Sequence, residues 1–516
     1  MTVEKRSHAA LSRRLADEQA KARAMGGEAG LARHRASGRL PVRERIDLLI
    51  DPGSWFEIGA LALPELRTER HVPGDAVVTG FALLHGRRVG VVGIDSSVLA
   101  GTTAPTSMRK QGRLIDRAQN AGFPLVLLCD ADGGRIPDVM GFRFSGLPLD
   151  FKTFVKTPSH LPTVPREAAI LGPSYGDSAL HASTAHFVVM VEFGAVALSG
   201  PSVVQSAINE TLDDAALGGP AAATAVGNAH MVVPTEADAM AAIGAFLSYL
   251  PSNASLPAPV TVARDPARDP AAIADTVPID TQVAYDIRDV IDSIVDDGSY
   301  FPWANAWGPS LVCALARIEG RAVGIIANQP MMMAGAHDPA SLTKQHDFVA
   351  MCDTFNIPLV FLHDVPGLLI GTRAEQGGIL RAYERLVSRI ADASVPKVGV
   401  VLRKAYGGGH FAMGGRPTHP DFLFAWPNAE MGFMAPDTGV RTVYRRRLQK
   451  VLEDEGQAAH DRLLTELVQE WTLESEPWEG AANLSLDDII QPADTRRTLA
   501  RAIDVAWGER GYVSRR

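Results

Sequence analysis

The sequence predicts an α/β protein built from two homologous domains. Its apolar segments, such as those beginning at Phe123 and Ile357, are hydrophobic throughout instead of alternating, which is typical of strands buried in a parallel sheet. Helical stretches such as 109–121 separate these strands, as in α/β units. The chain also repeats itself once, which indicates two copies of the same domain.

The repeat consists of four matching segments in the same order. A helix and turn come first, then a Gly-containing turn that enters a strand, then two apolar strands that each end in a glycine-bearing loop. The repeat pairs Asp130 with Asp364, and Tyr175 with Tyr406. The matched segments are 43–57 with 288–302, 85–93 with 319–327, 123–133 with 357–367, and 165–178 with 396–409.

The repeat also sets the expected domain boundaries. Residues 1–35, rich in Arg, Lys and Ala, predict an N-terminal helical segment, interpreted equally as a solvated charged face or as a docking surface for a partner. Residues 36–255 and 281–516 are expected to form the two homologous domains. The Pro-rich stretch 256–280 predicts a semi-rigid linker between them.

Composition excludes several classes of protein. The 516 residues carry 50 Lys plus Arg against 59 Asp plus Glu, a formal net charge of −9, which argues against a nucleic-acid binder. Three cysteines without CxxC spacing predict neither disulfides nor a zinc ribbon. No signal pattern and no apolar run of membrane-spanning length occurs, so a cytoplasmic protein without membrane contact is expected. The absence of P-loop, HExxH and EF-hand patterns argues against ATP hydrolysis and against catalysis by a metal.

The strand-to-loop junctions are the candidate sites, because the carboxyl ends of parallel strands form the binding crevice of open α/β sheets. In the second copy the strand is followed by Gly407, Gly408 and Gly409, just before a helix. Consecutive glycines let the backbone approach a ligand and direct successive N–H groups to one point, as in an oxyanion hole. Glycine runs also serve close packing, and the pattern alone gives both interpretations equal weight.

The first copy has lost two of these glycines. Gly176 remains, whereas Asp177 and Ser178 replace the second and third glycine, so the two turns are no longer equivalent. An ionised Asp177 would oppose the charge that an oxyanion hole stabilises, although a carboxyl group of raised pKa can act as an acid or base. The alternative, slightly favoured by the pattern, is that Asp177 caps the following helix.

The stretch from Gly172 to Gly176 also fits the G-x-S-x-G nucleophile elbow, with Ser174 as the nucleophile. A pattern with three fixed positions often arises by chance, and the second copy has Ala405 at the matching position. Histidines that would complete a triad include His181, His186 and His410. Hydrolysis through Ser174 therefore stays an alternative hypothesis.

Together these motifs resemble the carboxyltransferase (β) subunits of biotin-dependent acyl-CoA carboxylases, the family of the propionyl-CoA and methylcrotonyl-CoA carboxylase β chains. The resemblance spans about residues 35 to 450 and is strongest in the second copy, in ANQPMMMAGAHD, CDTFNIPLVFLHDVPGLLIGT, VPKVGVVLRKAYGGG and AWPNAEMGFM. In the first copy ERIDLLIDPGSWFEIG, GDAVVTGFA and LSGPSVV also match.

The resemblance implies two crotonase-like (ClpP/crotonase) domains in a homohexamer made from dimers. It implies that acyl-CoA binds to the first domain and carboxybiotin to the second domain of a neighbouring subunit. A carboxyl group would then pass from carboxybiotin to the α or γ carbon of the acyl-CoA. Because the chain has no biotinylation sequence and no ATP-binding domain, a biotin carboxylase and a biotin carboxyl carrier protein are expected as separate partners.

The resemblance also implies two groups of site residues. On the carboxybiotin side, the backbone N–H groups of Gly408 and Gly409 act as donors, flanked by Ala405, Tyr406 and Gly407. On the acyl-CoA side, Gly176 and Asp177 occupy the oxyanion hole, and the other residues expected to contribute are Gly133, Gly134, Arg135 and Lys110.

Departures from the family pattern cluster on the acyl-CoA side. DADGGRI replaces DSGGARI and so gains Asp132, GPSYGDS replaces GPCAGGA, and the stretch 147–165 does not follow the family's glycine-bearing helix. On the other side, Phe411 stands where a polar residue is often found. Three hypotheses follow. They are a carboxyltransferase for a non-standard acyl-CoA, a repurposed hydrolase, acyltransferase or decarboxylase, and a non-catalytic partner of an active paralogue. We favour the first, because the carboxybiotin side is intact.

Overall fold

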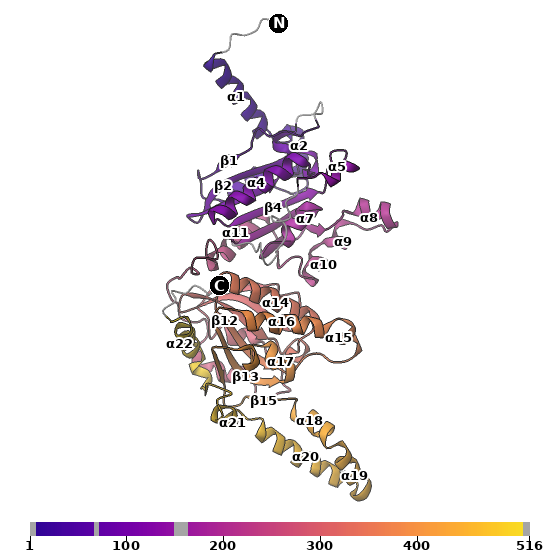
Figure 1. The fold of residues 1–516 in the computed structure, drawn as a ribbon, viewed down its shortest axis with the longest axis vertical. Helices are drawn as coiled ribbons and strands as arrows, with labels where there is room; N and C mark the ends of the chain where they lie inside the picture. Colours follow the sequence, from indigo (N-terminus) through magenta and orange to yellow (C-terminus); the bar gives the residue numbers. More distant parts are fainter. Residues whose placement is uncertain (1–6, 67–71, 149–163, 509–516) are drawn as a thin grey trace. The chain divides into compact units, whose positions relative to one another are not determined.

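The computed structural model describes residues 7–66, 72–148 and 164–508 and divides the chain into two compact units (Figure 1). The first unit ends at Ser255 and the second begins at Leu256. Within the described residues each unit contains one eight-stranded sheet. This mixed α/β architecture confirms the predicted fold class.

The first sheet has the strand order β1-β2-β3-β4-β5-β6-β8, with β7 paired to β5 beyond the end of β6. The pairs β1–β2 and β2–β3 are antiparallel, and the remaining pairs are parallel. The strands are β1 (Phe56–Ile58), β2 (Val77–Leu84), β3 (Arg87–Ile94), β4 (Leu125–Asp132), β5 (Arg166–Tyr175), β6 (Phe187–Val191), β7 (Ala195–Ala197) and β8 (Met231–Val233).

The second sheet repeats this topology strand by strand, in the order β9-β10-β11-β12-β13-β14-β16 with β15 paired to β13. The two sheets even share an irregularity in strand register. The register between β4 and β5 shifts after Cys129, and the register between the equivalent strands β12 and β13 shifts after His363. The strands are β9 (Phe301–Trp303), β10 (Leu311–Ile318), β11 (Arg321–Asn328), β12 (Leu359–Val365), β13 (Lys397–Tyr406), β14 (Phe422–Ala425), β15 (Glu430–Gly432) and β16 (Asp488–Ile489).

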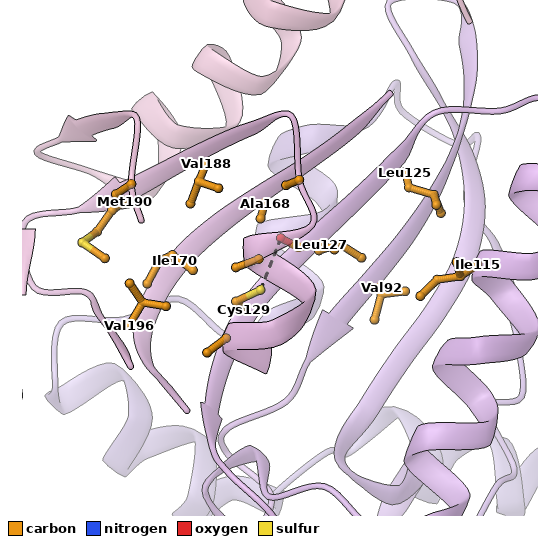
Figure 2. Packing of buried hydrophobic residues seen from close by; sticks show 14 of the residues in the cluster. Val92, Ile115, Leu125, Leu127, Cys129, Ala168, Ile170, Val188, Met190 and Val196 are labelled. Carbon is orange, nitrogen blue, oxygen red and sulfur yellow. Dashed lines mark hydrogen bonds between the residues drawn. The ribbon is translucent and has the colours of Figure 1, made fainter. Parts of the chain in front are cut away.

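The central strands are buried on both faces, which explains their continuous apolar sequence. Figure 2 shows one face of the first sheet, where Leu127 of β4, Ile170 of β5 and Val188 of β6 pack in one cluster with Ile115. Ile115 belongs to α4 (Pro105–Ala121), the helix that connects β3 to β4. The core therefore fixes β4 and β5 side by side, and their carboxyl ends carry the candidate loops.

The N-terminal segment forms α1 (His8–Arg23) and α2 (Gly27–Ala36). It packs on the first unit, because a Cβ atom on Gly26 would lie only 2.2 Å from the carbonyl oxygen of Ser97. The Gly26 N–H also donates to Ser97 Oγ at 3.2 Å. One face of this charged segment is thus a packed surface.

The stretch for which the sequence predicts a linker packs along the second unit. Thr261 donates its N–H to the carbonyl of Gly320 at 2.9 Å, and Arg403 Nη1 donates to the carbonyl of Pro278 at 3.2 Å. Backbone hydrogen bonds and a buried cation therefore hold residues 256–280 in place.

The remaining helices cover the sheets or extend from them. In the first unit they are α3 (Val42–Leu49), α5 (Phe142–Ser145), α7 (Asp177–Ser183), α8 (Pro201–Ile208), α9 (Asp214–Gly218), α10 (Pro220–Ala225) and α11 (Glu236–Tyr249). In the second they are α12 (Ile273–Thr276), α13 (Ile287–Ile291), α14 (Pro339–Thr354), α15 (Thr372–Gln376), α16 (Ile379–Asp392), α17 (Gly407–Ala412), α18 (Pro436–Val443), α19 (Arg445–Glu455), α20 (Gln457–Glu474), α21 (Pro477–Ala482) and α22 (Thr495–Trp507). Helices α18 to α20 extend from the second unit around their own small core (Figure 1). None of the helices in the described ranges is long and apolar enough to cross a membrane.

Candidate active site

Each unit brings two loops together at the carboxyl ends of its central parallel strands. In the first unit these are the loop after β4, at Gly133, and the turn after β5, at Gly176. A Cβ atom on Gly176 would lie 3.4 Å from the Cα of Gly133. In the second unit a Cβ atom on Gly409 would lie 2.8 Å from the Cα of Gly367. The close approach in both units is the geometry expected for a binding crevice at this edge of the sheet.

The turn of the second unit consists of three glycines, so no side chain covers its backbone. Gly407 has a φ of 52°, and Gly408 and Gly409 follow it in the first turn of α17. The N–H groups at the start of a helix have no acceptor within the helix, so they are available to a ligand. Ala405 and Tyr406 end β13 and are buried, and the Tyr406 hydroxyl donates to Glu430. The structure thus places these five residues at the end of β13 and in the turn that follows it.

The equivalent turn of the first unit has only one glycine, Gly176, which is followed by Asp177 and Ser178. Gly176 has a φ of 64°, and its N–H donates to the carbonyl of Leu198 at 3.2 Å. Asp177 begins α7 with only 8% of its surface exposed, and its Oδ1 accepts from the hydroxyl of Thr103 at 2.7 Å. Burial raises the pKa of Asp177, an effect opposed by the Thr103 hydroxyl and by backbone N–H groups at the helix start. Among the described residues its Oδ2 has no hydrogen-bond partner.

Thr103 also holds the neighbouring loop. Its N–H donates to the carbonyl of Gly133 at 2.9 Å, and its carbonyl accepts from Arg135 at 2.7 Å. The Arg135 guanidinium pairs with buried Asp75 at 2.5 Å. The structure therefore brings Gly133, Gly134 and Arg135 beside Gly176 and Asp177, with Arg135 anchored to the domain.

Lys110 lies apart from these loops. Its Nζ donates to the carbonyl of Val77 at 2.5 Å, and burial lowers the pKa of Lys110 to about 8. Lys344 repeats the arrangement in the second unit, donating to Leu311 at 2.5 Å, and burial lowers its pKa to about 8 as well. Both lysines serve the same structural contact between the helix and the sheet.

Ser174 lies inside β5, between Ala131 of β4 and Val196 of β7, and is fully buried. Its hydroxyl donates to the carbonyl of Gly172 at 3.4 Å. A nucleophile elbow places the serine at the sharp turn itself, whereas this turn begins two residues later. Within the described part of the first unit neither His181 nor His186 is hydrogen-bonded to this hydroxyl: His186 accepts the N–H of Arg166, and burial lowers the pKa of His181 to about 3.

A pocket of about 700 Å³ opens beside the loop after β4 in the first unit. Asp132 and Arg135 line it from the loop, Arg33 lines it from α2, and Arg39 lines it from the stretch between α2 and α3. Burial raises the pKa of Asp132, as does the charge of Asp214. The contribution of the N-terminal segment was missed by sequence reasoning. Its only signal was the glycine spacing that lets α2 approach Ser97.

Two further departures concern the edges of the sites. Most of the stretch 147–165 lies outside the described residues. Phe411 is 37% exposed on α17, two residues beyond Gly409. Within the described ranges no group of three or more His, Cys, Asp or Glu residues is arranged to hold a metal ion.

Two duplicated crotonase-type sheets, each with a glycine turn over its parallel strands, define a two-domain carboxyltransferase. Residues 33–516 match the carboxyl transferase domain family. The methylmalonyl-CoA carboxyltransferase 12S subunit of Propionibacterium freudenreichii subsp. shermanii is 35% identical over 497 residues, covering 95% of this chain and 93% of that one. The mitochondrial propionyl-CoA carboxylase beta chain of Homo sapiens is 32% identical over 489 residues, covering 93% and 88%.

Solved structures agree with this relationship. The transcarboxylase 12S structure with methylmalonyl-coenzyme A and methylmalonic acid bound has a TM-score of 0.91 at 33% identity, covering all of this chain and 98% of that one. The chain belongs to the carboxyl transferase domain family, and its chemistry is that of the acyl-CoA carboxylase β-type subunits, the transfer of a carboxyl group.

Proposed function

We propose that this chain transfers a carboxyl group between carboxybiotin and a non-standard acyl-CoA, with carboxybiotin at the second unit and acyl-CoA at the first. The contrast between the two equivalent turns supports this assignment. The second turn keeps Gly408 and Gly409, whereas the first carries Asp177 and Ser178. A turn that serves one invariant cofactor stays constant, while a turn that serves a variable acyl group is free to change.

The second turn fits a planar amide-like group. Only glycine fits at Gly407 and Gly409, because a Cβ atom would lie 2.9 Å from the carbonyl oxygen of Phe433 or 2.7 Å from Val365 Cγ2. Gly408 and Gly409 would donate N–H groups to the ureido oxygen, while Ala405 and Tyr406 fix the end of β13. When bound, carboxybiotin supplies the carboxyl group.

The first unit offers an acyl-CoA two kinds of contact. Arg33 and Arg39 line the 700 Å³ pocket, and guanidinium groups suit the phosphates of coenzyme A. Gly133 and Gly134 lie beside the Gly176 turn, where backbone N–H groups would face a thioester oxygen. Arg135 would keep this loop in place through its pair with Asp75. Lys110 would contribute only through the strand it supports.

Asp177 is the residue that we expect to determine which acyl-CoA the protein accepts. Its carboxyl group replaces a glycine and has an unpartnered buried oxygen. In the same turn the Gly176 N–H already donates to the carbonyl of Leu198, so the turn has one fewer free donor for the oxyanion of an ordinary enolate. These two observations also support a second candidate, a non-catalytic subunit that pairs with an active paralogue.

Assembly and partners follow the same proposal. The solved transcarboxylase 12S relative is described as a hexamer, and we propose a homohexamer for this chain. Biotin would arrive on a separate carrier protein, charged by a separate biotin carboxylase, in the cytoplasm. Light scattering of the pure protein tests the assembly, and a single-subunit mass would contradict it.

The activity is tested by incubating the pure protein with carboxyacyl-CoAs of different chain length and branching, with and without free biotin, and by mass spectrometry of the thioesters. Biotin-dependent loss of the carboxyl group with the thioester intact supports the proposal and identifies the acyl class. Release of free CoA indicates a hydrolase, and loss of the carboxyl group without biotin indicates a decarboxylase. No reaction with any substrate favours the non-catalytic subunit.

Replacing Asp177 by Gly tests its role in the same assay. If Asp177 excludes ordinary acyl groups, the variant gains transfer on a short straight-chain substrate. Loss of all transfer would instead assign Asp177 a direct part in the reaction. Asp177→Asn serves as the matched control, because it keeps the size of the side chain and removes its charge.

A further inference from the structure

Three histidines gather next to the glycine turn of the second unit. His410 directly follows Gly409 in α17, His363 lies in β12, and His337 precedes α14. The ring centroids of His363 and His410 are 5.5 Å apart. His337 is tied to the loop after β12 by its backbone, because its N–H donates to the carbonyl of Gly367 at 3.2 Å and its carbonyl accepts from Leu369 at 2.8 Å.

Two of these imidazoles are buried and that of His410 is half-buried, and each of the three has a ring nitrogen without a hydrogen-bond partner among the described residues. His337 and His363 are 1% and 0% exposed, and among the described residues neither ring nitrogen of either side chain has a partner. The same holds for the buried Nδ1 of His410. A buried polar atom without a partner costs stability, and such atoms in a native structure usually have a functional reason.

The duplication shows that the fold does not require these rings. At the equivalent positions the first unit has Thr103, Cys129 and Ala179. Thr103 makes the same two backbone hydrogen bonds to its neighbouring loop as His337 does. The backbone contact is therefore common to both units, whereas the three imidazoles occur only beside the Gly407–Gly409 turn.

The cluster resists protonation. Burial lowers the pKa of His337 to about 4, against a smaller opposing effect of Asp338, and burial lowers the pKa of His410 to about 4. Burial lowers the pKa of His363 well below its ordinary value, and positive charge on His410 or His337 adds to this effect. Protonation of one ring thus disfavours protonation of its neighbour.

In the part of the chain that the structure describes, the carboxylates that flank the cluster in sequence, Asp338 and Asp364, already have partners. The Asp338 carboxylate accepts the Ser341 N–H at 2.7 Å as the cap of α14, and Lys344 of the same helix is bound to the carbonyl of Leu311. Asp364 follows His363 in β12, so it points to the opposite face. There it pairs with Arg403 and Lys404 of β13. The other ionisable side chains nearby are Tyr383 of α16 and Arg416, and Arg416 is paired with Asp487.

We propose that His337, His363 and His410 are positioning residues for the carboxybiotin turn: as neutral rings they hold α17 against β12, and their protonation in acid releases Gly408 and Gly409. This inference rests on the proposed function, since it assigns carboxybiotin to that turn. The predicted consequence is an acid limb of carboxyl transfer that originates in the second unit.

Hydrogen exchange of the full-length protein tests the conformational part without reference to activity. As the pH falls from neutral toward about 4, the chemical-rate-corrected exchange of segment 405–416 is expected to accelerate by about tenfold per pH unit for each ring that becomes protonated. Segment 105–121 of the first unit, which contains no histidine, is the internal control and is expected to stay unchanged. Equal acceleration of both segments, or of neither, would overturn the proposal.

The variant that tests the residues takes its substitutions from the first unit: His337→Thr, His363→Cys and His410→Ala together. Its segment 405–416 is expected to lose the pH response, whereas His460→Gln, outside the cluster, keeps it. His410→Ala alone is the fallback if the triple variant does not fold, and its pH response is expected to be weaker. An unchanged response in these variants contradicts the proposal.

The transfer assay then separates this proposal from the proposed function. In the wild type, kcat for biotin-dependent transfer is expected to fall over the pH range in which segment 405–416 opens, while KM for the acyl-CoA stays constant. His410→Ala is expected to shift that fall to lower pH. If the wild type transfers nothing, the proposed function fails, while the exchange experiment still decides the role of the histidines.

Discussion

Gly172 and Arg403 occupy the same position in the two sheets, three residues before the tyrosine that ends the site strand. In the second unit Arg403 Nη2 pairs with the buried carboxylate of Asp364 at 3.0 Å. In the first unit a Cβ atom on Gly172 would lie 2.4 Å from Oδ1 of the equivalent Asp130. There Asp130 pairs with two other arginines: Arg39 Nη1 lies 2.8 Å from its Oδ1, and Arg45 Nη1 of α3 lies 2.9 Å from its Oδ2.

The two units therefore neutralise equivalent aspartates with cations from different elements: Asp364 pairs with Arg403 and Lys404 of β13, whereas Asp130 pairs with Arg39 and Arg45. The position equivalent to Arg45 is Val290, which is fully buried. In the first unit, α3 has Arg45 and β5 has Gly172 at these two positions. In the second unit, α13 has Val290 and β13 has Arg403. Both units thus have a buried aspartate at this position, and the arginines that pair with it come from different elements in the two units.

Arg45→Met is expected to destabilise the first unit by about 3–5 kcal/mol, because it leaves the buried Glu236 carboxylate without its arginine and Asp130 with Arg39 alone. Urea unfolding followed by fluorescence, with each unit's transition resolved, measures the effect. Arg35→Gln is the control, since Arg35 forms an exposed pair with Glu44 and should cost less than about 1 kcal/mol. Equal costs for the two variants would show that burial of the pair does not matter.

Much of the fold was accessible from the sequence, because buried parallel strands carry continuous apolar runs and the duplication presents each run twice. The matched segments around Asp130 and Asp364 predicted the two site strands in each copy. The antiparallel pairing of β1, β2 and β3 was not predicted, since these strands are also largely apolar and their direction depends on turns. The packing of α2 escaped prediction because its surface composition is that of a solvated helix.

The site was accessible in part. The glycine run Gly407 to Gly409 indicated where the backbone approaches a ligand or a packed neighbour, and the pattern alone did not distinguish the two. The surroundings of Asp177 were not accessible, because its partner Thr103 lies 74 residues away and no local pattern reports that contact. The location of Lys110 was hidden for the same reason: the carbonyl of Val77 that it binds is 33 residues distant.

Gly409→Ala is expected to reduce biotin-dependent carboxyl transfer by about 10²- to 10³-fold, the typical cost of losing an oxyanion donor. The new methyl group would meet the Cα of Gly367 at 2.8 Å, so the turn must move. Gly408→Ala is the matched comparison, because its methyl group would meet only the ends of Leu368 and Tyr383 at 3.2 and 3.3 Å. A larger loss for Gly408→Ala than for Gly409→Ala would argue against this geometry.

Ser174→Ala is expected to leave carboxyl transfer unchanged. The hydroxyl lies within the sheet and makes one long hydrogen bond, so its removal should cost less than about 1 kcal/mol. Measuring transfer and CoA release side by side checks the result. If the wild type releases CoA and the variant does not, Ser174 is a nucleophile and the hydrolase hypothesis gains support.

The stability of the second unit is expected to rise between about pH 8 and pH 10.5 because of Lys344. Burial lowers the pKa of Lys344 to about 8 from the ordinary value of 10.5, so over this range the unfolded chain binds a proton that the folded chain does not. Stability increases with pH wherever the unfolded state binds more protons. The full rise is on the order of 3 kcal/mol, at about 1.4 kcal/mol per pKa unit.

Lys344→Met isolates this contribution, because it removes the titrating group and keeps an unbranched side chain in the same place. The difference in unfolding free energy between wild type and variant should change by that amount across the range and should be constant below about pH 8. Lys110→Met is the matched variant in the first unit, where burial also lowers the lysine pKa to about 8. A pH-independent difference in both units would mean that these ammonium groups are solvated in the native protein.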